Sequence, residues 1–330
     1  MITPNVEERL ESTVNRLRDW RTVRYEFLPV VYTDEVNDKQ VLPIDFNSWK
    51  NFEKPYTIYE EDKYFWFKAN FEIKRKNSHQ KAYFVLDYHI DGRFVASTIR
   101  PQGLLYVNGK ITQGIDINHG EVLLDDGNYE IYLLFYSHTF GRYLPMDFAI
   151  KYVDERIDGL YYDLFVPYQG MKLLDKKSNG YTLSASVIEK ALNLLDVRSV
   201  HSNEFYDSIE KTRKFMAENY YSAICNEKTT VSCIGHTHID VAWMWTLDQT
   251  KQKIERSFST VLKLMEEYPE YRFFSSQPQL FDYLKERNPE LYQRVKEKIL
   301  EGRWEVDGSM WLEADCNLTS GESLVRQILF

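Results

Sequence analysis

Three side chains that could bind a metal stand at alternate positions in the C-terminal third of the chain: His236, His238 and Asp240. They follow Val231–Ile234, a short run whose composition predicts a buried parallel strand that ends at Gly235. In an extended backbone, alternate side chains point to the same side, so these three would converge on one small volume. Two imidazoles and a carboxylate are suitable ligands for a divalent ion of the zinc type. We therefore predict a metal site at the carboxyl end of this strand, which is where α/β enzymes have their active sites.

Two further groups of polar side chains could take part in chemistry. Asp116, Asn118 and His119 share a short loop, where we interpret them as hydrogen-bonding groups that stabilise the turn. Glu313 and Asp315 follow a predicted strand near the C-terminus. For this pair, a role as active-site acids and a role as structural hydrogen-bond acceptors both stay open.

Composition limits the class of protein. The chain has 330 residues, enough for two domains, of which 43% are hydrophobic and 28% charged. A net charge of −9 argues against a nucleic acid or an anionic membrane as partner. The three cysteines, Cys225, Cys233 and Cys316, form no closely spaced pair, which indicates a reducing compartment. Because the sequence shows neither a signal-peptide pattern nor an apolar run of about 20 residues, we expect a cytoplasmic protein.

Antiparallel β structure is predicted for residues 46–165. Segments rich in aromatic and β-branched residues recur there, and Asn108-Gly109 between two of them is a strong hairpin signal. Short strands at this spacing, with no helical pattern between them, indicate a β-sandwich accessory domain. The preceding residues 1–45 predict one amphipathic helix followed by an irregular segment.

Helices come next, and then strands and helices alternate. Residues 166–228 are interpreted as a helical linker, and the pattern over residues 229–330 is α/β. In that last part the strand before His236 is followed by a helix, a strand near Phe273, two helices and a strand near Trp304. The predicted fold is therefore multidomain α+β: an antiparallel β-sandwich and a helical linker, then the first βα units of a barrel.

The last predicted helix begins at a capping box, Thr319-Ser-Gly-Glu322, and the sequence ends within this helix at Phe330. Arg326 and Glu322 are expected to cap and anchor it. Three βα units bury too little apolar surface for a closed barrel. We therefore expect the chain to be the N-terminal part of a longer protein with a truncated barrel.

Five blocks in the C-terminal third occur in the order found in one enzyme family. They are Gly235-His-Thr-His-Ile-Asp-Val-Ala-Trp-Met-Trp245, Ser276-Gln-Pro-Gln-Leu280, Glu301-Gly-Arg-Trp-Glu305, Trp311-Leu-Glu-Ala-Asp315 and Gly321-Glu-Ser-Leu-Val-Arg-Gln327. Together they closely resemble the glycoside hydrolase family 38 α-mannosidases, in the bacterial and cytosolic or vacuolar branch. The upstream part resembles, more loosely, the β-rich accessory domain of that branch, including its Asp-x-Asn-His pattern at Asp116, Asn118 and His119.

This resemblance implies a (β/α)7 barrel that holds one zinc ion and hydrolyses α-mannosides with retention of configuration. The family's metal-binding histidine and aspartate fall on His238 and Asp240. The resemblance thus replaces the three-ligand prediction by two ligands, with His236 supporting them from behind. The tryptophan that stacks beneath the mannose ring falls on Trp243. The implied partners are mannose-containing oligosaccharides or mannosides, and homo-oligomerisation stays open.

The resemblance also implies that the site is incomplete. The family's nucleophilic aspartate belongs to a Trp-x-x-Asp-x-Phe-Gly block that does not occur before Phe330, and the remaining metal ligands also come later. A retaining glycosidase needs two carboxyl groups about 5 Å apart, one to attack and one to donate a proton. The chain alone is therefore expected to be inactive and to bind zinc weakly.

Two alternatives stay open. A metal-dependent amidohydrolase also carries His-x-His at an early barrel strand, but Trp243 and the Gly302-Arg-Trp-Glu305 block do not fit that class. The β-rich domain by itself could be a non-catalytic carbohydrate-binding module. Glycan binding by residues 1–170 would distinguish that role from packing against the catalytic part.

Overall fold

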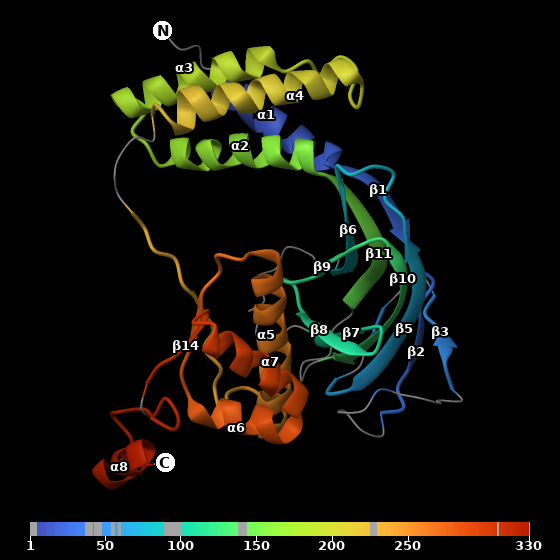
Figure 1. The fold of residues 1–330 in the computed structure, drawn as a ribbon, viewed down its shortest axis with the longest axis vertical. Helices are drawn as coiled ribbons and strands as arrows, with labels where there is room; N and C mark the ends of the chain where they lie inside the picture. Colours follow the sequence, from blue (N-terminus) through green and yellow to red (C-terminus); the bar gives the residue numbers. More distant parts are fainter. Residues whose placement is uncertain are drawn as a thin grey trace.

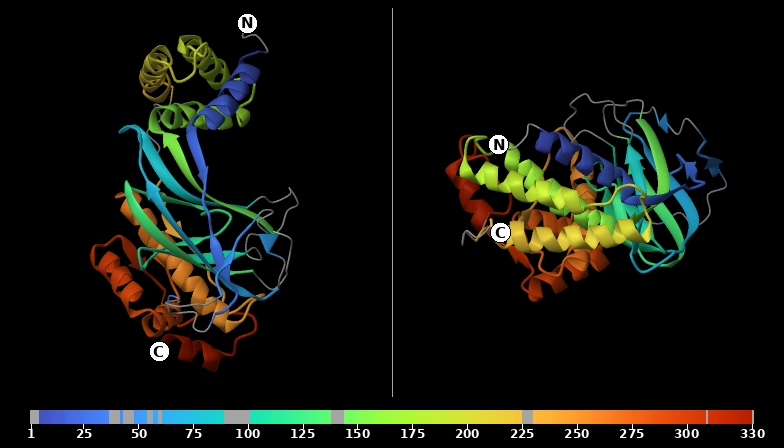
Figure 2. Two further views of the ribbon diagram at one scale, coloured as in Figure 1. Left: turned by 90° about the vertical axis from the view of Figure 1, so that its right-hand side faces the viewer. Right: turned by 90° about the horizontal axis from the view of Figure 1, so that it is seen from above.

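The computed structural model describes residues 5–36, 42, 48–53, 57–58, 61–88, 101–137, 144–224, 230–308 and 310–329. A layer of helices lies at one end of the molecule, and beneath it a β-sandwich and an α/β part lie side by side (Figure 1). Figure 2 shows from the side that the helical layer stands at the end away from the C-terminus. The chain passes from the helical layer into the sandwich, returns to the helical layer, and then crosses to the α/β part.

The helical layer combines helices that precede and follow the sandwich in sequence. They are α1 (Asn5–Trp20), α2 (Glu155–Lys172), α3 (Asn179–Leu194), α4 (Asn203–Met216) and a π-helical turn at Ala217–Tyr221. Their apolar stripes meet in one core, in which Leu10, Leu160 and Phe205 are fully buried. Ser178 and Ser202 cap α3 and α4. The helix predicted near the N-terminus is confirmed as α1.

The prediction of β structure up to residue 165 is wrong, because α2 begins at Glu155. Asp154 caps this helix, and one side of it packs onto α1 and α4. The run of aromatic and apolar residues from 160 to 166 favours a strand by composition, but tertiary packing makes it helical. The described part of segment 166–228 therefore packs with α1 in one layer.

The β-sandwich consists of two antiparallel sheets. One has the order β1-β11-β6-β9 with β4 beside β11, and the other has the order β3-β2-β5-β10-β7-β8. The strands are β1 (Thr22–Phe27), β2 (Val31–Thr33), β3 (Lys50–Asn51), β4 (Thr57–Ile58), β5 (Tyr64–Ile73), β6 (Gln80–Tyr88), β7 (Gln102–Val107), β8 (Lys110–Ile115), β9 (Glu121–Leu124), β10 (Gly127–Tyr136) and β11 (Leu144–Asp154). Phe67, Phe84 and Phe148 are part of the aromatic core between the sheets. The predicted hairpin turn is confirmed, since Asn108 and Gly109 both have positive φ angles, 48° and 81°.

The sandwich begins earlier in the chain than residue 46. Strands β1 and β2 lie in the segment that the sequence predicted to be irregular, and β1 pairs with β11 at the other end of the domain. An edge strand of this kind is stabilised by its partner as much as by its own residues. In β1 the alternation of Val23, Tyr25 and Phe27 with charged residues is a strand signal that the prediction overlooked.

The α/β part contains a parallel sheet in the order β12-β13-β14, formed by Gly235–His236, Phe273–Ser275 and Trp304–Val306. Its helices are α5 (Leu247–Glu267), α6 (Pro278–Arg287), α7 (Pro289–Leu300) and α8 (Gly321–Leu329). Phe258 and Phe273 both pack against the ring of Trp304 in the core of this part. The predicted alternation of parallel strands and helices is confirmed for three strands, and closure into a barrel stays a prediction.

The strand predicted at residues 231–234 is wrong in position and in burial. Strand β12 begins only at Gly235, and Val231 and Ile234 are 75% and 64% exposed. In the part of the chain that the structure describes, β12 pairs only with β13, over two residues. Within the described ranges, no neighbouring element therefore covers the side chains of Val231 and Ile234.

Helix α8 differs from its prediction at its cap. The Ser320 hydroxyl accepts a hydrogen bond from the backbone N–H of Ser323 at 3.2 Å, so Ser320 rather than Thr319 is the capping residue. Arg326 and Glu322, expected to cap and anchor this helix, form an ion pair with each other at 2.6 Å. No helix in the described ranges, α8 included, is long and apolar enough to cross a membrane.

Helix α5 joins the α/β part to the sandwich. Gly114 in β8 approaches it so closely that a Cβ atom at this position would lie 2.5 Å from the carbonyl oxygen of Arg256. The Thr260 hydroxyl accepts a hydrogen bond from the Gly114 N–H at 3.1 Å. On α7, Arg294 donates to the carbonyl oxygen of Ile111 at 2.9 Å. The two parts therefore share a close, partly backbone-to-backbone boundary (Figure 1).

Candidate active site

His238 and Asp240 lie together on the loop that follows β12. The Nε2 atom of His238 is 3.1 Å from Oδ1 of Asp240, and the two side chains are 53% and 38% exposed. The Thr250 hydroxyl of α5 donates to the Asp240 carbonyl oxygen at 3.1 Å and fixes the loop to the helix. Two of the three predicted ligands are thus brought together, although outside a regular strand.

This pair fits a metal ion of the zinc type. Zinc binds nitrogen and oxygen ligands at about 2.0–2.1 Å, so two ligand atoms of a tetrahedron are about 3.3 Å apart. The 3.1 Å between His238 Nε2 and Asp240 Oδ1 is close to that separation. Among the described residues, no group of three or more His, Cys, Asp or Glu side chains could hold a metal ion. The described chain therefore offers two ligands and not a complete set.

Glu313, whose role the sequence left open, lies against His238. Its Oε2 is 2.7 Å from Nδ1 of His238, and its Oε1 accepts a hydrogen bond from the Ser276 hydroxyl at 2.5 Å. If Nδ1 donates to this carboxylate, Nε2 keeps the lone pair that binds a metal. Partial burial tends to raise the pKa of Glu313, but hydrogen bonds from Ser276 and Gln277 and the charge of His238 outweigh it and lower the pKa. Glu313 is therefore a carboxylate at neutral pH.

Sequence reasoning missed this contact because Glu313 and His238 belong to different βα units. One indication was available. Glu313 follows β14, and the carboxyl ends of parallel strands lie at the same edge of a sheet. The residues that follow β12 and β14 were therefore candidates for one site.

Asp315 and the cysteines were also singled out from the sequence. Asp315 accepts a hydrogen bond from the backbone N–H of Asn317 at 2.7 Å, and its role in catalysis stays open. Cys233 and Cys316 are exposed and free, and Cys225 lies outside the described residues.

His236 does not join His238 and Asp240. Its Nδ1 lies 3.1 Å from the carbonyl oxygen of Phe274, and the centres of the His236 and Phe274 rings are 5.0 Å apart. His236 thus links β12 to β13 beside the pair. The convergence of all three side chains, expected from their alternate spacing, is wrong for His236 because the extended backbone ends there.

Trp243 stands on the same loop with 50% of its surface exposed. Its ring meets that of Trp245 edge to face at 5.5 Å, and the Trp245 indole donates to the Thr250 hydroxyl at 2.9 Å. Because Thr250 also binds the carbonyl of Asp240, one residue of α5 positions both the aromatic pair and the carboxylate. An exposed indole beside polar groups offers a surface on which the apolar face of a sugar can stack.

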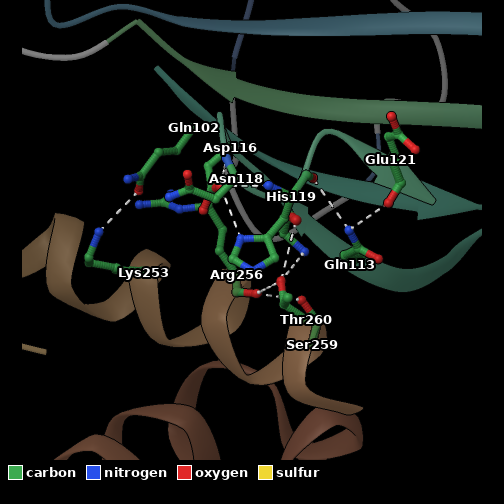
Figure 3. A network of polar contacts seen from close by, with 11 residues as sticks. Gln102, Gln113, Asp116, Asn118, His119, Glu121, Lys253, Arg256, Ser259 and Thr260 are labelled. Carbon is green, nitrogen blue, oxygen red and sulfur yellow. Dashed lines mark hydrogen bonds and ion pairs between the residues drawn. The ribbon is translucent and has the colours of Figure 1, made fainter. Parts of the chain in front are cut away.

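Asp116, Asn118 and His119 form the hydrogen-bonded loop that the sequence predicted. Oδ1 of Asp116 accepts bonds from the backbone N–H groups of Asn118 and His119, at 2.7 and 2.9 Å, and lies 3.0 Å from Nδ1 of His119. The hydrogen bond that His119 makes to the Asp116 carboxylate raises the pKa of His119, although burial opposes it. This loop faces α5 (Figure 3).

Residues 228–330 match the family described as "Glycosyl hydrolases family 38 N-terminal domain". This match confirms the resemblance to glycoside hydrolase family 38 that the five blocks carry. Over 353 residues the chain is 27% identical to "Alpha-mannosidase G" of Dictyostelium discoideum, covering 98% of this chain and 30% of that protein. Over 134 residues it is 38% identical to "Alpha-mannosidase" of Saccharomyces cerevisiae, covering 40% of this chain and 12% of that protein. Over 100 residues it is 45% identical to "Alpha-mannosidase 2C1" of Homo sapiens, covering 30% of this chain and 10% of that protein.

These relatives are longer than the segment that they share with this chain. The chain spans less than a third of the length of each of them. The two relatives of higher identity match over shorter stretches of the chain, whereas the Dictyostelium protein matches nearly all of it.

Proposed function

We propose that the chain is the N-terminal part of a retaining, zinc-dependent α-mannosidase that hydrolyses terminal α-linked mannose from glycans or mannosides. The observation that carries this proposal is the His238–Asp240 pair, 3.1 Å apart, on one loop with the half-exposed indole of Trp243. The family match of residues 228–330 and the names of the curated relatives support it.

The residues of the chain have separable roles in this proposal. His238 and Asp240 would hold the zinc ion, while Glu313 accepts the Nδ1 proton of His238 and keeps Nε2 free. When bound, zinc would coordinate the 2- and 3-hydroxyls of mannose and favour a ring distorted toward the oxocarbenium-like transition state. Trp243 would lie beneath the apolar face of the same ring and exclude water from it. The nucleophilic aspartate is expected beyond Phe330, so the chain alone would be inactive.

The test uses a longer protein that includes the remaining ligands, with a chromogenic α-mannoside as substrate. The double variant His238→Ala, Asp240→Ala is expected to lose stoichiometric zinc and turnover together. Proton NMR is expected to show α-mannose as the first product. Turnover that survives exhaustive chelation, or β-mannose as the first product, would contradict the proposal.

The amidohydrolase alternative has less support. It would use His236 and His238 as joint ligands, but the family match of residues 228–330 lies with glycoside hydrolases. A cytoplasmic location, a homo-oligomer and a carbohydrate-binding role of the sandwich stay predictions.

A further inference from the structure

A cavity of about 290 Å³ lies between the loop after β8 and helix α5. Asp116 and His119 line it from the sandwich, and Lys253 and Arg256 line it from α5 (Figure 3). Its volume is at the lower end of ligand pockets, which begin at about 300 Å³. The wall of the cavity continues to residues 236–238, so it borders the candidate active site.

Arg256 is buried in this wall, and its Nε donor is unsatisfied. The residue is 8% exposed, and its Nη2 donates one long hydrogen bond, 3.4 Å, to Oε1 of Gln249. Its Nε is buried and has no acceptor among the described residues. A guanidinium carries five N–H donors, and leaving them unpaired inside a protein is costly. Arg256 therefore favours an acceptor inside the cavity.

Lys253 is the second cation of the cavity. Its ammonium donates to Oε1 of Gln102 at 3.3 Å and lies 5.1 Å from the centre of the Trp245 ring. Burial lowers the pKa of Lys253 to about 8, and the charge of Arg256 acts in the same direction. Near neutral pH both groups are charged, so an anion close to both would offset their mutual repulsion.

The neighbouring acids leave these two cations without a salt bridge in the described structure. Asp116 is held by His119, whose Nδ1 lies 3.0 Å from its Oδ1. Glu255, on the same helix, forms its salt bridge with Arg287, whose Nε is 2.7 Å from Oε2. Each of these acids is thus engaged by another partner at short range, although the charge of Asp116 still acts on both cations and that of Asp240 on Lys253.

We propose that this cavity binds a small oxyanion of the phosphate or sulfate type, held by the guanidinium of Arg256 and the ammonium of Lys253. Guanidinium donors match the oxygens of a tetrahedral oxyanion in pairs, and an ammonium adds a compact point charge. The anion is either a free ion or a group carried by a sugar, because the cavity reaches Thr237 and His238. The site is defined by anion binding and does not depend on the proposed hydrolysis.

Titration calorimetry of the 330-residue chain with inorganic phosphate and with sulfate, in a chloride buffer at pH 7, measures this binding. Saturable binding at one site is expected. Lys253→Gln is expected to weaken it about tenfold or more, as the loss of a charge-assisted hydrogen bond does. Arg256→Gln tests the second cation, and circular dichroism shows whether this buried variant folds. Lys251→Gln is the matched control, since its ammonium lies on the same helix over the ring of Tyr283.

Mannose 6-phosphate distinguishes the two sources of the anion, with mannose as the uncharged reference. Mannose 6-phosphate that binds at least as tightly as phosphate indicates an anion carried by a sugar, and phosphate that binds alone indicates a free ion. Either result supports the site when Lys253→Gln weakens binding and Lys251→Gln does not. The proposal is overturned if the folded chain binds none of the three oxyanions, or if Lys253→Gln leaves their binding unchanged.

Discussion

The carboxylate of Glu313 lies 2.7 Å from Nδ1 of His238, while the other ring nitrogen of His238 faces Asp240 at 3.1 Å. The Ser276 hydroxyl holds Glu313 in turn. These residues follow β14, β12 and β13, so all three parallel strands contribute to one chain of contacts. A carboxylate at Nδ1 fixes the orientation and tautomer of an imidazole and makes Nε2 a better metal ligand.

Glu313→Gln is expected to lower zinc affinity about 10- to 100-fold in a protein that includes the remaining ligands. The amide keeps the shape of the side chain but loses the charge that polarises His238. Competition with a chelator measures the affinity without reference to turnover. Asp315→Asn is the control, because Asp315 binds the backbone N–H of Asn317 and not His238. Equal affinities for Glu313→Gln and the unaltered protein would show that this carboxylate does not act on the metal site.

Trp243→Ala is expected to reduce kcat/KM for an α-mannoside about tenfold in the same longer protein, which corresponds to about 1.4 kcal/mol of lost stacking. Zinc content is expected to stay at its normal level, because the exposed indole does not hold the loop. Trp243→Phe should recover part of the loss. If Trp243→Ala also releases zinc, the indole has a structural role instead.

Gly114→Ala is expected to lower the free energy of unfolding by about 2 kcal/mol. The added Cβ would lie 2.5 Å from the carbonyl oxygen of Arg256, so β8 and α5 would have to move apart. Urea denaturation of the 330-residue chain measures this change. Gly170→Ala in α2 is the control, because no heavy atom lies within 4 Å of its Cβ position and alanine favours a helix. Similar stabilities for both variants would mean that the contact between β8 and α5 yields at little cost.

Asp154→Asn tests the start of α2 through pH. Burial tends to raise the pKa of Asp154, but its bonds with Arg156, including one of 2.6 Å, outweigh it and lower the pKa. Since the folded pKa lies below the unfolded value of about 3.9, the carboxylate stabilises the fold above that pH and loses this effect as pH falls through the folded pKa. The variant should therefore cost about 1–3 kcal/mol at pH 7 and progressively less below about pH 4.

The control for this prediction is Asp196→Asn. Asp196 makes the same kind of contact with Arg198 two residues later, but Arg198 is mostly exposed. Asp196→Asn should therefore change the free energy of unfolding far less than Asp154→Asn at pH 7. A pH-independent loss in Asp154→Asn would indicate that the cap, and not the charge, matters.

Local residue patterns predicted the elements whose form depends on neighbours in sequence. The hairpin at Asn108-Gly109 and the helices around Ile254 and Leu291 follow from turn chemistry and apolar spacing. Helix α2 did not follow, because it depends on packing with α1 and α4, whereas the alternating residues of strand β1 were a local signal that was overlooked.

The same distinction holds for the candidate site. His238 and Asp240 are two residues apart, and their proximity was predictable from the sequence. The contact of Glu313 with His238, and the meeting of Asp116 with Lys253 and Arg256 at one cavity, depend on how separate elements pack. Residue types alone do not identify such partners, although the positions of Glu313 and His238 after parallel strands made them candidates for one site.

The close approach of Gly114 to α5 also bears on how this protein can change over evolutionary time. A recombination event that joined α5 to a different β domain would have to supply a residue without a side chain opposite Arg256, and an N–H group for Thr260. Few foreign surfaces meet both conditions. The sandwich and the α/β part are therefore expected to be inherited as one unit and not shuffled as independent modules.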